Sequence, residues 1–186
     1  MRKDIRNGAA IFPMPVILIA TYNEDGTVDV MNAAWCTAYD MAQVQLNISE
    51  SHLTTKNIRR TRSFSIALAD VNHIVEADYV GIVSGEKVKD KFEKTGLTAS
   101  KGQMVNAPVL EDFPVIMECE LVDADFLEYG VIGEVKRLAV KEEYLDKDGK
   151  VDVAKLGIIA YDPINHGYHV VGEKVGQAFS DGRKIK

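Results

Sequence analysis

Residues 49–57, which read SESHLTTKN, join a strand pattern to a helix pattern. Before them, residues 43–48 alternate polar and apolar side chains, which is the period of a half-buried β-strand. After them, residues 56–60 read as the start of a short helix, with Ser51 or Thr54 as its N-cap. Unpaired backbone N–H groups, the positive end of the helix dipole, hydroxyl groups and Lys56 would converge there. The stretch therefore predicts either an anion-binding site or an ordinary capped helix.

The segment N-terminal to this stretch has the pattern of a β-hairpin. Residues 16–20 (VILIA) form a continuously apolar run, which is typical of a buried strand. An Asp-Gly turn at residues 25–26 favours a return strand over residues 27–31. The return strand leads into residues 32–39 (NAAWCTAY), where small residues stand beside an aromatic ring and a thiol. This composition allows either the close approach of a flat ligand or a tightly packed strand with a core tryptophan.

The segment C-terminal to the stretch begins with a strand over residues 64–68, followed by a helix that Asp70 caps and that reaches residue 83. Residues 86–94 predict a second helix closed by Gly96. Lys87 and Lys91 would share one face of this helix, as a phosphate contact or as a solvated charged face.

The remainder is dominated by strand patterns. Residues 97–114 lack periodicity and contain two prolines, so they predict a long loop. Residues 147–150 (KDGK) predict a turn. Strands are expected at residues 115–121, 130–140, 156–161 and 167–171. We find no repeat or linker, so residues 1–186 are expected to form a single domain. Many short antiparallel strands with helical excursions predict a mainly β barrel with inserted helices.

Composition narrows the class of protein. The chain has 186 residues and a formal net charge of −6, which disfavours a nucleic-acid binder. It has no apolar run of the roughly 20 residues that a membrane helix needs, and its first residues lack the apolar core of a signal peptide. The two cysteines are too few for a disulfide framework. We therefore expect a cytoplasmic protein that binds neither membrane nor nucleic acid.

The sequence lacks the motifs of several kinds of binding site and catalytic site. It contains neither a Gly-x-Gly-x-x-Gly dinucleotide motif nor a Walker phosphate loop. The four histidines have no spacing with cysteines or carboxylates that indicates a metal site. Cys36 is a weak candidate nucleophile because no partner base can be named. No catalytic residue is assigned.

Taken together, the chain resembles the flavin reductase-like, FMN-binding split-barrel family, and within it the flavoredoxin branch. The resemblance covers nearly the whole chain in order. It departs at residues 40–43 (DMAQ), where the family often has a proline-rich step. The matching pieces are residues 15–20 with 25–26, 32–35, 49–55, 84–85 with 90–92 and 96–97, 133–135, and 168–172 with Gly176.

This resemblance implies an antiparallel Greek-key split β-barrel with inserted helices. It also implies a homodimer that holds FMN noncovalently near the subunit interface. Residues 32–37 would line the flavin ring, and residues 49–56 would cradle the ribityl chain and phosphate, with a second positive charge from Lys91. The implied cofactor-binding residues are Asn32, Ala33, Ala34, Trp35, Cys36, Thr37, Ser49, Ser51, His52, Thr54, Thr55, Lys56, Ser84 and Lys91.

The resemblance leaves more than one function open. An oxidoreductase of the flavin reductase type would pass electrons from NAD(P)H through FMN to an acceptor. A flavoredoxin-like carrier would bind FMN tightly and take electrons from another redox protein, without oxidising NAD(P)H itself. The third hypothesis is a barrel that binds a different planar or phosphorylated ligand, such as haem, or that serves mainly as an interaction module.

Overall fold

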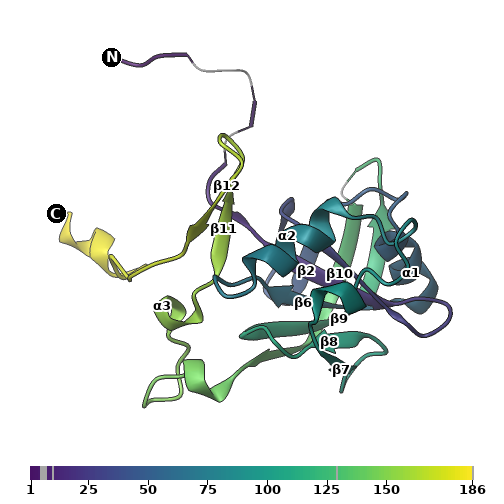
Figure 1. Cartoon of the computed structure of the whole chain (residues 1–186). Helices are drawn as coiled ribbons and strands as arrows, with labels where there is room; N and C mark the ends of the chain where they lie inside the picture. Colours follow the sequence, from purple (N-terminus) through teal and green to yellow (C-terminus); the bar gives the residue numbers. More distant parts are fainter. Residues whose placement is uncertain (5–7, 10, 129, 186) are drawn as a thin grey trace.

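The computed structural model describes residues 1–4, 8, 9, 11–128 and 130–185. Its body is a seven-stranded antiparallel sheet with the strand order β3-β2-β6-β9-β10-β5-β4 (Figure 1). The two edge strands, β3 and β4, are joined by residues 34 and 35 alone, so the sheet must curl until its edges approach each other. This curled sheet confirms the expected split β-barrel. Its strands are β2 (Ile17–Tyr22), β3 (Val28–Ala33), β4 (Cys36–Ala38), β5 (Gln43–Leu46), β6 (Ser63–Leu68), β9 (Val115–Asp125) and β10 (Gly130–Val140).

Two smaller sheets and three α-helices complete the fold. A three-stranded sheet with the order β1-β11-β12 projects from the barrel, and a β7–β8 hairpin lies against the body (Figure 1). Among the described residues, no helix is long and apolar enough to cross a membrane. These elements are β1 (Met14–Pro15), β7 (Ala99–Lys101), β8 (Pro108–Leu110), β11 (Ile159–Asp162), β12 (Gly167–Val170), α1 (Leu53–Thr61), α2 (Ile74–Ile82) and α3 (Val153–Leu156), with 3-10 turns at Glu93–Thr95, Glu142–Tyr144 and Asp181–Lys184.

Strand β2 is apolar throughout because both of its faces are buried. Successive side chains of a strand point to opposite faces. Ile17 and Ile19 therefore enter one core, together with Phe64 and other side chains from β5, β9, β10 and α1. Leu18 and Ala20 enter a second core, which α2 and β8 cover. The barrel thus has a packed interior and a packed outer face, and the functional residues gather where α1 and α2 flank β3.

The strand predictions are largely confirmed, and so is the hairpin turn, in which Gly26 has φ of +84°. The turn at residues 147–150 is also present, with Gly149 at φ of +73°. The N-cap prediction is wrong, because His52 occupies the N-cap of α1 and no side chain caps it. The Asp70 carboxylate accepts N–H bonds before α2, but His73 is the N-cap residue.

Three other element predictions are wrong. Residues 86–94 form turns and then a single 3-10 turn, because the neighbours Lys91 and Phe92 both point inward. Residues 97–114 contain the β7–β8 hairpin in place of a long loop, since Val109 and Leu110 pack against the outer face of the sheet. The expected strand over residues 156–161 begins as the end of α3 and becomes strand only at Ile159.

Candidate functional site

The candidate site is a trough between β3, the N-terminus of α1 and the helix α2. It consists of two adjoining cavities of about 310 Å³ and about 390 Å³. Five residues line both cavities, so the two cavities form one continuous depression. The shared residues are Met31, Asn32, His52, Gly81 and Ile82.

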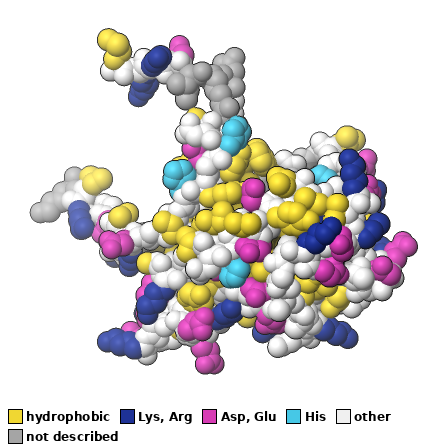
Figure 2. Space-filling view, viewed as in Figure 1, with side chains coloured by type: hydrophobic (Ala, Val, Ile, Leu, Met, Phe, Trp, Pro, Cys, Tyr) yellow, Lys and Arg dark blue, Asp and Glu magenta, His cyan; other side chains and the backbone are white. Residues whose placement is uncertain are grey.

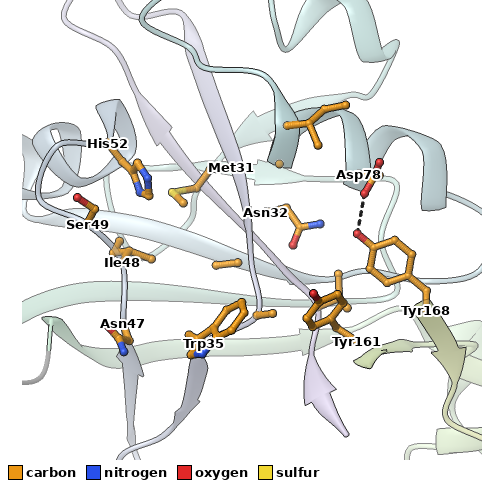
Figure 3. A pocket seen from close by; sticks show the side chains of 15 residues that line it. Met31, Asn32, Trp35, Asn47, Ile48, Ser49, His52, Asp78, Tyr161 and Tyr168 are labelled. Carbon is orange, nitrogen blue, oxygen red and sulfur yellow. Dashed lines mark hydrogen bonds between the residues drawn. The ribbon is translucent and has the colours of Figure 1, made fainter. Parts of the chain in front are cut away.

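One end of the trough is aromatic. Trp35, Tyr161 and Tyr168 lie together there (Figure 3), with ring centroids 6.1 Å apart for Trp35 and Tyr161 and 6.2 Å apart for the two tyrosines. Ala33 and Ala34 leave the adjacent backbone open to a ligand. Trp35 is 56% exposed, so the alternative of a core tryptophan is wrong. Flat aromatic faces beside small side chains suit a planar ring system.

Helix α2 fixes two polar side chains at this end. The hydroxyl of Tyr168 donates to Asp78 Oδ1 over 2.8 Å (Figure 3). Burial, together with this carboxylate, raises the pKa of Tyr168 to about 12. Asn32 Nδ2 donates to the carbonyl of Ala77 over 2.9 Å. Asn32 therefore lines this end of the trough with its amide group fixed by α2, and the Tyr168 proton is held by Asp78.

The other end of the trough is formed by the N-terminus of α1. Among the described residues, no side chain caps this nine-residue helix, and uncapped N–H groups at a helix N-terminus favour an anion. The preceding loop is held by hydroxyl groups. Ser49 and Ser51 bond each other over 2.8 Å, and Thr55 donates to the Ser49 carbonyl over 2.7 Å. The helix N-terminus and the Ser49 and Ser51 hydroxyls expected from residues 49–57 therefore lie together, whereas Lys56 does not line either cavity.

Lys91 forms the floor of this polar end and is only 4% exposed. Its ammonium lies 3.3 Å from Oδ1 of the buried Asp29, and the Thr54 hydroxyl donates to the other oxygen of that carboxylate. An unpaired buried charge is strongly disfavoured, so Asp29 accounts for the inward position of Lys91. An ammonium has three N–H donors, and those not directed at Asp29 can serve a ligand.

The structure brings most of the predicted site residues to the trough. Those that line it are Asn32, Ala33, Ala34, Trp35, Ser49, Ser51, His52, Thr54, Ser84 and Lys91.

Four predicted residues do not line either cavity. Cys36 is half-buried in β4, where burial raises the pKa of its thiol to about 12. Thr37 is exposed on the same strand, and Thr55 is buried beneath the loop. Lys56 forms an ion pair with Glu86 and lines a separate depression on the outer side of α1.

Several trough residues were not identified from the sequence. Tyr168 lies in a segment that carried the family resemblance, but no local pattern assigns it to a site. Tyr161 and Asp78 come from β11 and α2, far from residues 49–57 in the chain. Only the fold brings them to one place. The full trough also includes Met31, Asn47, Gly81 and Ile82.

A split barrel with a trough that has aromatic rings at one end and a helix N-terminus with a buried lysine at the other has the features of a ligand-binding β-barrel. Residues 9–155 match the family model described as "Flavin reductase like domain". The match covers more than half of the chain, so this protein belongs to that family.

Two solved structures and one further protein are similar to this chain. The flavoredoxin of Desulfovibrio vulgaris (Miyazaki F) is 31% identical and has a TM-score of 0.92, over 98% of this chain and 100% of that one. The flavoredoxin of Methanosarcina acetivorans is 26% identical, with a TM-score of 0.88 over the whole of both chains. An uncharacterized protein of Aeropyrum pernix is 27% identical over 137 residues, 70% of this chain and 51% of that protein. The chain thus spans about half the length of that relative.

Proposed function

We propose that this protein binds FMN noncovalently in the trough and acts as an oxidoreductase of the flavin reductase type, passing electrons from NAD(P)H to an acceptor. The observation that carries the proposal is the polarity of the trough. Its aromatic end matches a planar ring, and its other end, with the open N–H groups of α1 and the Lys91 ammonium, matches a phosphate. FMN has these two groups at its opposite ends.

Each group of residues has a separate task in this proposal. Bound FMN supplies hydride acceptance and onward electron transfer. Trp35 and the alanines before it bind the ring, and Asn32 offers a polar contact to its edge. Ser51, the first turn of α1 and Lys91 bind the phosphate. Asp29 keeps the buried ammonium in place, and the half-buried walls limit the access of water.

A flavoredoxin-like electron carrier is the second candidate. Its support is the similarity to two flavoredoxins over essentially the whole length of both chains. Such a carrier would hold FMN tightly, receive electrons from a redox protein and show no NAD(P)H oxidation of its own. In both candidates we propose a homodimer with the flavin near the subunit interface.

The first experiment is the visible absorbance spectrum of the purified protein, followed by denaturation and identification of the released chromophore. We expect FMN at about one per subunit. A colourless protein that also fails to take up added FMN would contradict both candidates.

Steady-state NAD(P)H oxidation by the FMN-loaded protein then separates the two candidates. Turnover of NADH or NADPH with an artificial acceptor supports the reductase. Negligible turnover, with normal electron uptake from a chemical reductant, supports the carrier.

A further inference from the structure

Tyr161 and His166 form a hydrogen-bonded pair at the aromatic end of the trough. The Tyr161 hydroxyl lies 2.6 Å from Nδ1 of His166, and the Tyr161 ring lines the cavity (Figure 3). His166 is exposed to solvent at the turn between β11 and β12. The pair therefore links the cavity to bulk water through one phenol and one imidazole, both of which can carry a proton.

The backbone holds His166 in an uncommon conformation for a residue other than glycine. Its φ is +60°, in the left-handed region, and its N–H donates to the carbonyl of Asp162 over 2.9 Å. This turn directs the imidazole back over Tyr161, with ring centroids 6.2 Å apart. Unusual backbone geometry of this kind is found most often at functional sites.

The second tyrosine of the cavity is not equivalent to the first. The proton of Tyr168 is held by the Asp78 carboxylate, and the pKa of Tyr168 is raised to about 12, so Tyr168 is a poor proton donor. The partner of Tyr161 is an imidazole, which can both accept and return a proton. Of the two tyrosines, Tyr161 is therefore the one whose hydroxyl contacts a group that can return a proton to it.

We propose that Tyr161 is a catalytic acid that protonates a quinone bound at the aromatic end of the trough, and that His166 is the positioning residue that returns the proton to Tyr161. The proposal rests on the proposed function, which supplies a reduced flavin. A quinone fits because it is planar and because its two-electron reduction requires a proton in addition to a hydride.

Bound reduced flavin would supply a hydride to one quinone oxygen. Tyr161 gives its hydroxyl proton to the other carbonyl oxygen, so the quinone becomes the hydroquinone and Tyr161 becomes the tyrosinate. The tyrosinate then takes the Nδ1 proton of the His166 imidazolium, which leaves a neutral imidazole, and solvent returns a proton to this exposed imidazole.

The test compares two acceptors with the FMN-loaded protein after stoichiometric reduction by dithionite, so that NAD(P)H is not needed. In stopped-flow mixing, 1,4-benzoquinone requires a proton, whereas ferricyanide takes one electron and no proton. For Tyr161→Phe we expect the reoxidation rate with benzoquinone to fall about 10²-fold, the lower range for loss of a general acid. The rate with ferricyanide should stay unchanged. His166→Asn should show the same selective loss, by a smaller factor.

His169→Asn is the matched control, because it removes another exposed imidazole from the same hairpin, one that contacts Phe12 and Asp162. It should leave both rates unchanged. A readout independent of turnover is the binding of 4-fluorophenol, a redox-inert mimic of the product, to the oxidised protein by ¹⁹F NMR. Tyr161→Phe should raise its Kd about fivefold, as for loss of one hydrogen bond.

The outcomes separate the two proposals. Failure to take up flavin would overturn the proposed function and, with it, the role of Tyr161. Normal flavin loading and reduction, with an unchanged benzoquinone rate in Tyr161→Phe, would overturn the role of Tyr161 alone. Equal losses with benzoquinone and ferricyanide would also overturn it, because they would indicate a structural effect.

Discussion

At the scale of single residues, the charge of Lys91 is balanced before any ligand arrives. The sequence presents Lys91 as one of several lysines in a charged segment and predicts either a phosphate contact or a solvated charged face. The structure places it beside the buried Asp29, which also accepts from Thr54. Nothing in the local sequence links residue 29 to residue 91. The affinity of this end for phosphate therefore depends on spare N–H donors more than on net charge.

This arrangement allows a clean test of the Lys91 ammonium. Removing Lys91 alone would leave a buried carboxylate unpaired, and removing Asp29 alone would leave a buried ammonium unpaired, so we compare the unmodified protein with the double variant Asp29→Asn/Lys91→Met. If Lys91 binds the phosphate, the double substitution should weaken FMN binding by about 1.5–3 kcal/mol, the range for hydrogen bonds to charged groups. Riboflavin, which lacks the phosphate, should bind the two proteins equally in calorimetric titrations. A similar loss for both ligands would contradict the assignment.

Trp35 provides a second prediction at this scale. It is the sole tryptophan of the chain, and it lines the aromatic end of the trough. Because a flavin ring bound there would be in contact with the indole, adding FMN to the cofactor-free protein should quench the tryptophan fluorescence. Riboflavin should quench it as well. Undiminished emission from a flavin-loaded sample would place the ring elsewhere.

At the scale of elements, the sequence predicts strands better than the segments between them. Alternation and apolar runs identify β2, β5, β6, β9 and β10, because burial of a strand face imposes a period of two. The hairpin β7–β8 was missed since Val109 and Leu110 pack on a sheet whose position no local pattern reveals. The helix predicted over residues 86–94 is wrong for the same reason. Asp29 pairs with Lys91, and the core that contains Leu18 buries Phe92, so both neighbouring side chains point inward.

The contact between β10 and β6 should be sensitive to a single methyl group. A Cβ at Gly133 would lie 2.3 Å from Cζ of Phe64, which is fully buried in the barrel interior. Overpacking of this kind typically costs about 1–3 kcal/mol, so Gly133→Ala should lower the free energy of unfolding by that amount in urea denaturation. Gly172→Ala is the control, since nothing lies within 4 Å of its added Cβ. Equal stability of the two variants would mean that the barrel repacks freely.

Glu118 couples β9 to the segment before β8 in a pH-dependent way. Burial raises the pKa of this carboxyl, but N–H bonds from Met104 and Val105 and the guanidinium of Arg137, 2.8 Å away, together hold the pKa below its ordinary value. A lowered pKa in the folded state means that the carboxylate contributes stability above the unfolded-state pKa of about 4.3. That contribution is lost as the pH falls through the folded-state pKa.

Glu118→Gln should therefore destabilise the protein by about 1.5–3 kcal/mol at pH 7, and the difference should shrink as the pH falls below about 4. Thermal unfolding of the unmodified protein and of Glu118→Gln across pH 3–7 measures this difference in stability. A difference that is constant over the whole range would show that the ionised form of Glu118 has no special role.

At the scale of the whole molecule, the trough could be predicted only in part. The loop and the helix start at the α1 end are encoded locally, in residues 49–57, and were predicted from the sequence, but the N-cap residue and the position of Lys56 were not. The aromatic end joins β3 to β11 and β12, so Tyr161 and Tyr168 became site residues only when the fold placed them beside Trp35.

Figure 2 shows apolar side chains across the middle of the face that carries α2, and Val75 and Ile82 of this helix are exposed. A single chain therefore leaves apolar surface next to the site.

The exposed C-terminal segment supports the proposed homodimer. It extends away from the barrel beyond β12 (Figure 1), and Val175, Phe179 and Ile185 are almost fully exposed. Burial of these apolar side chains against a partner would remove them from water, and a second copy of this chain is the partner that the family resemblance implies. We therefore expect the full chain to be a dimer by size-exclusion chromatography with light scattering. A chain ending at Val171 should shift towards monomer.

FMN affinity should depend on dimer formation, so it provides a second measurement of the assembly beside the molecular mass. If FMN lies near the interface, the shortened chain should bind FMN more weakly, because a wall of the trough would be lost with the partner. Phe179→Ser in the full chain is the milder variant, since it removes one apolar contact and leaves the backbone in place. It should weaken dimerisation in a concentration-dependent way, and FMN affinity should fall in parallel with the dimer fraction. A full-length chain that is monomeric with FMN bound would contradict the proposal, because the trough of one subunit would then be sufficient to hold the cofactor.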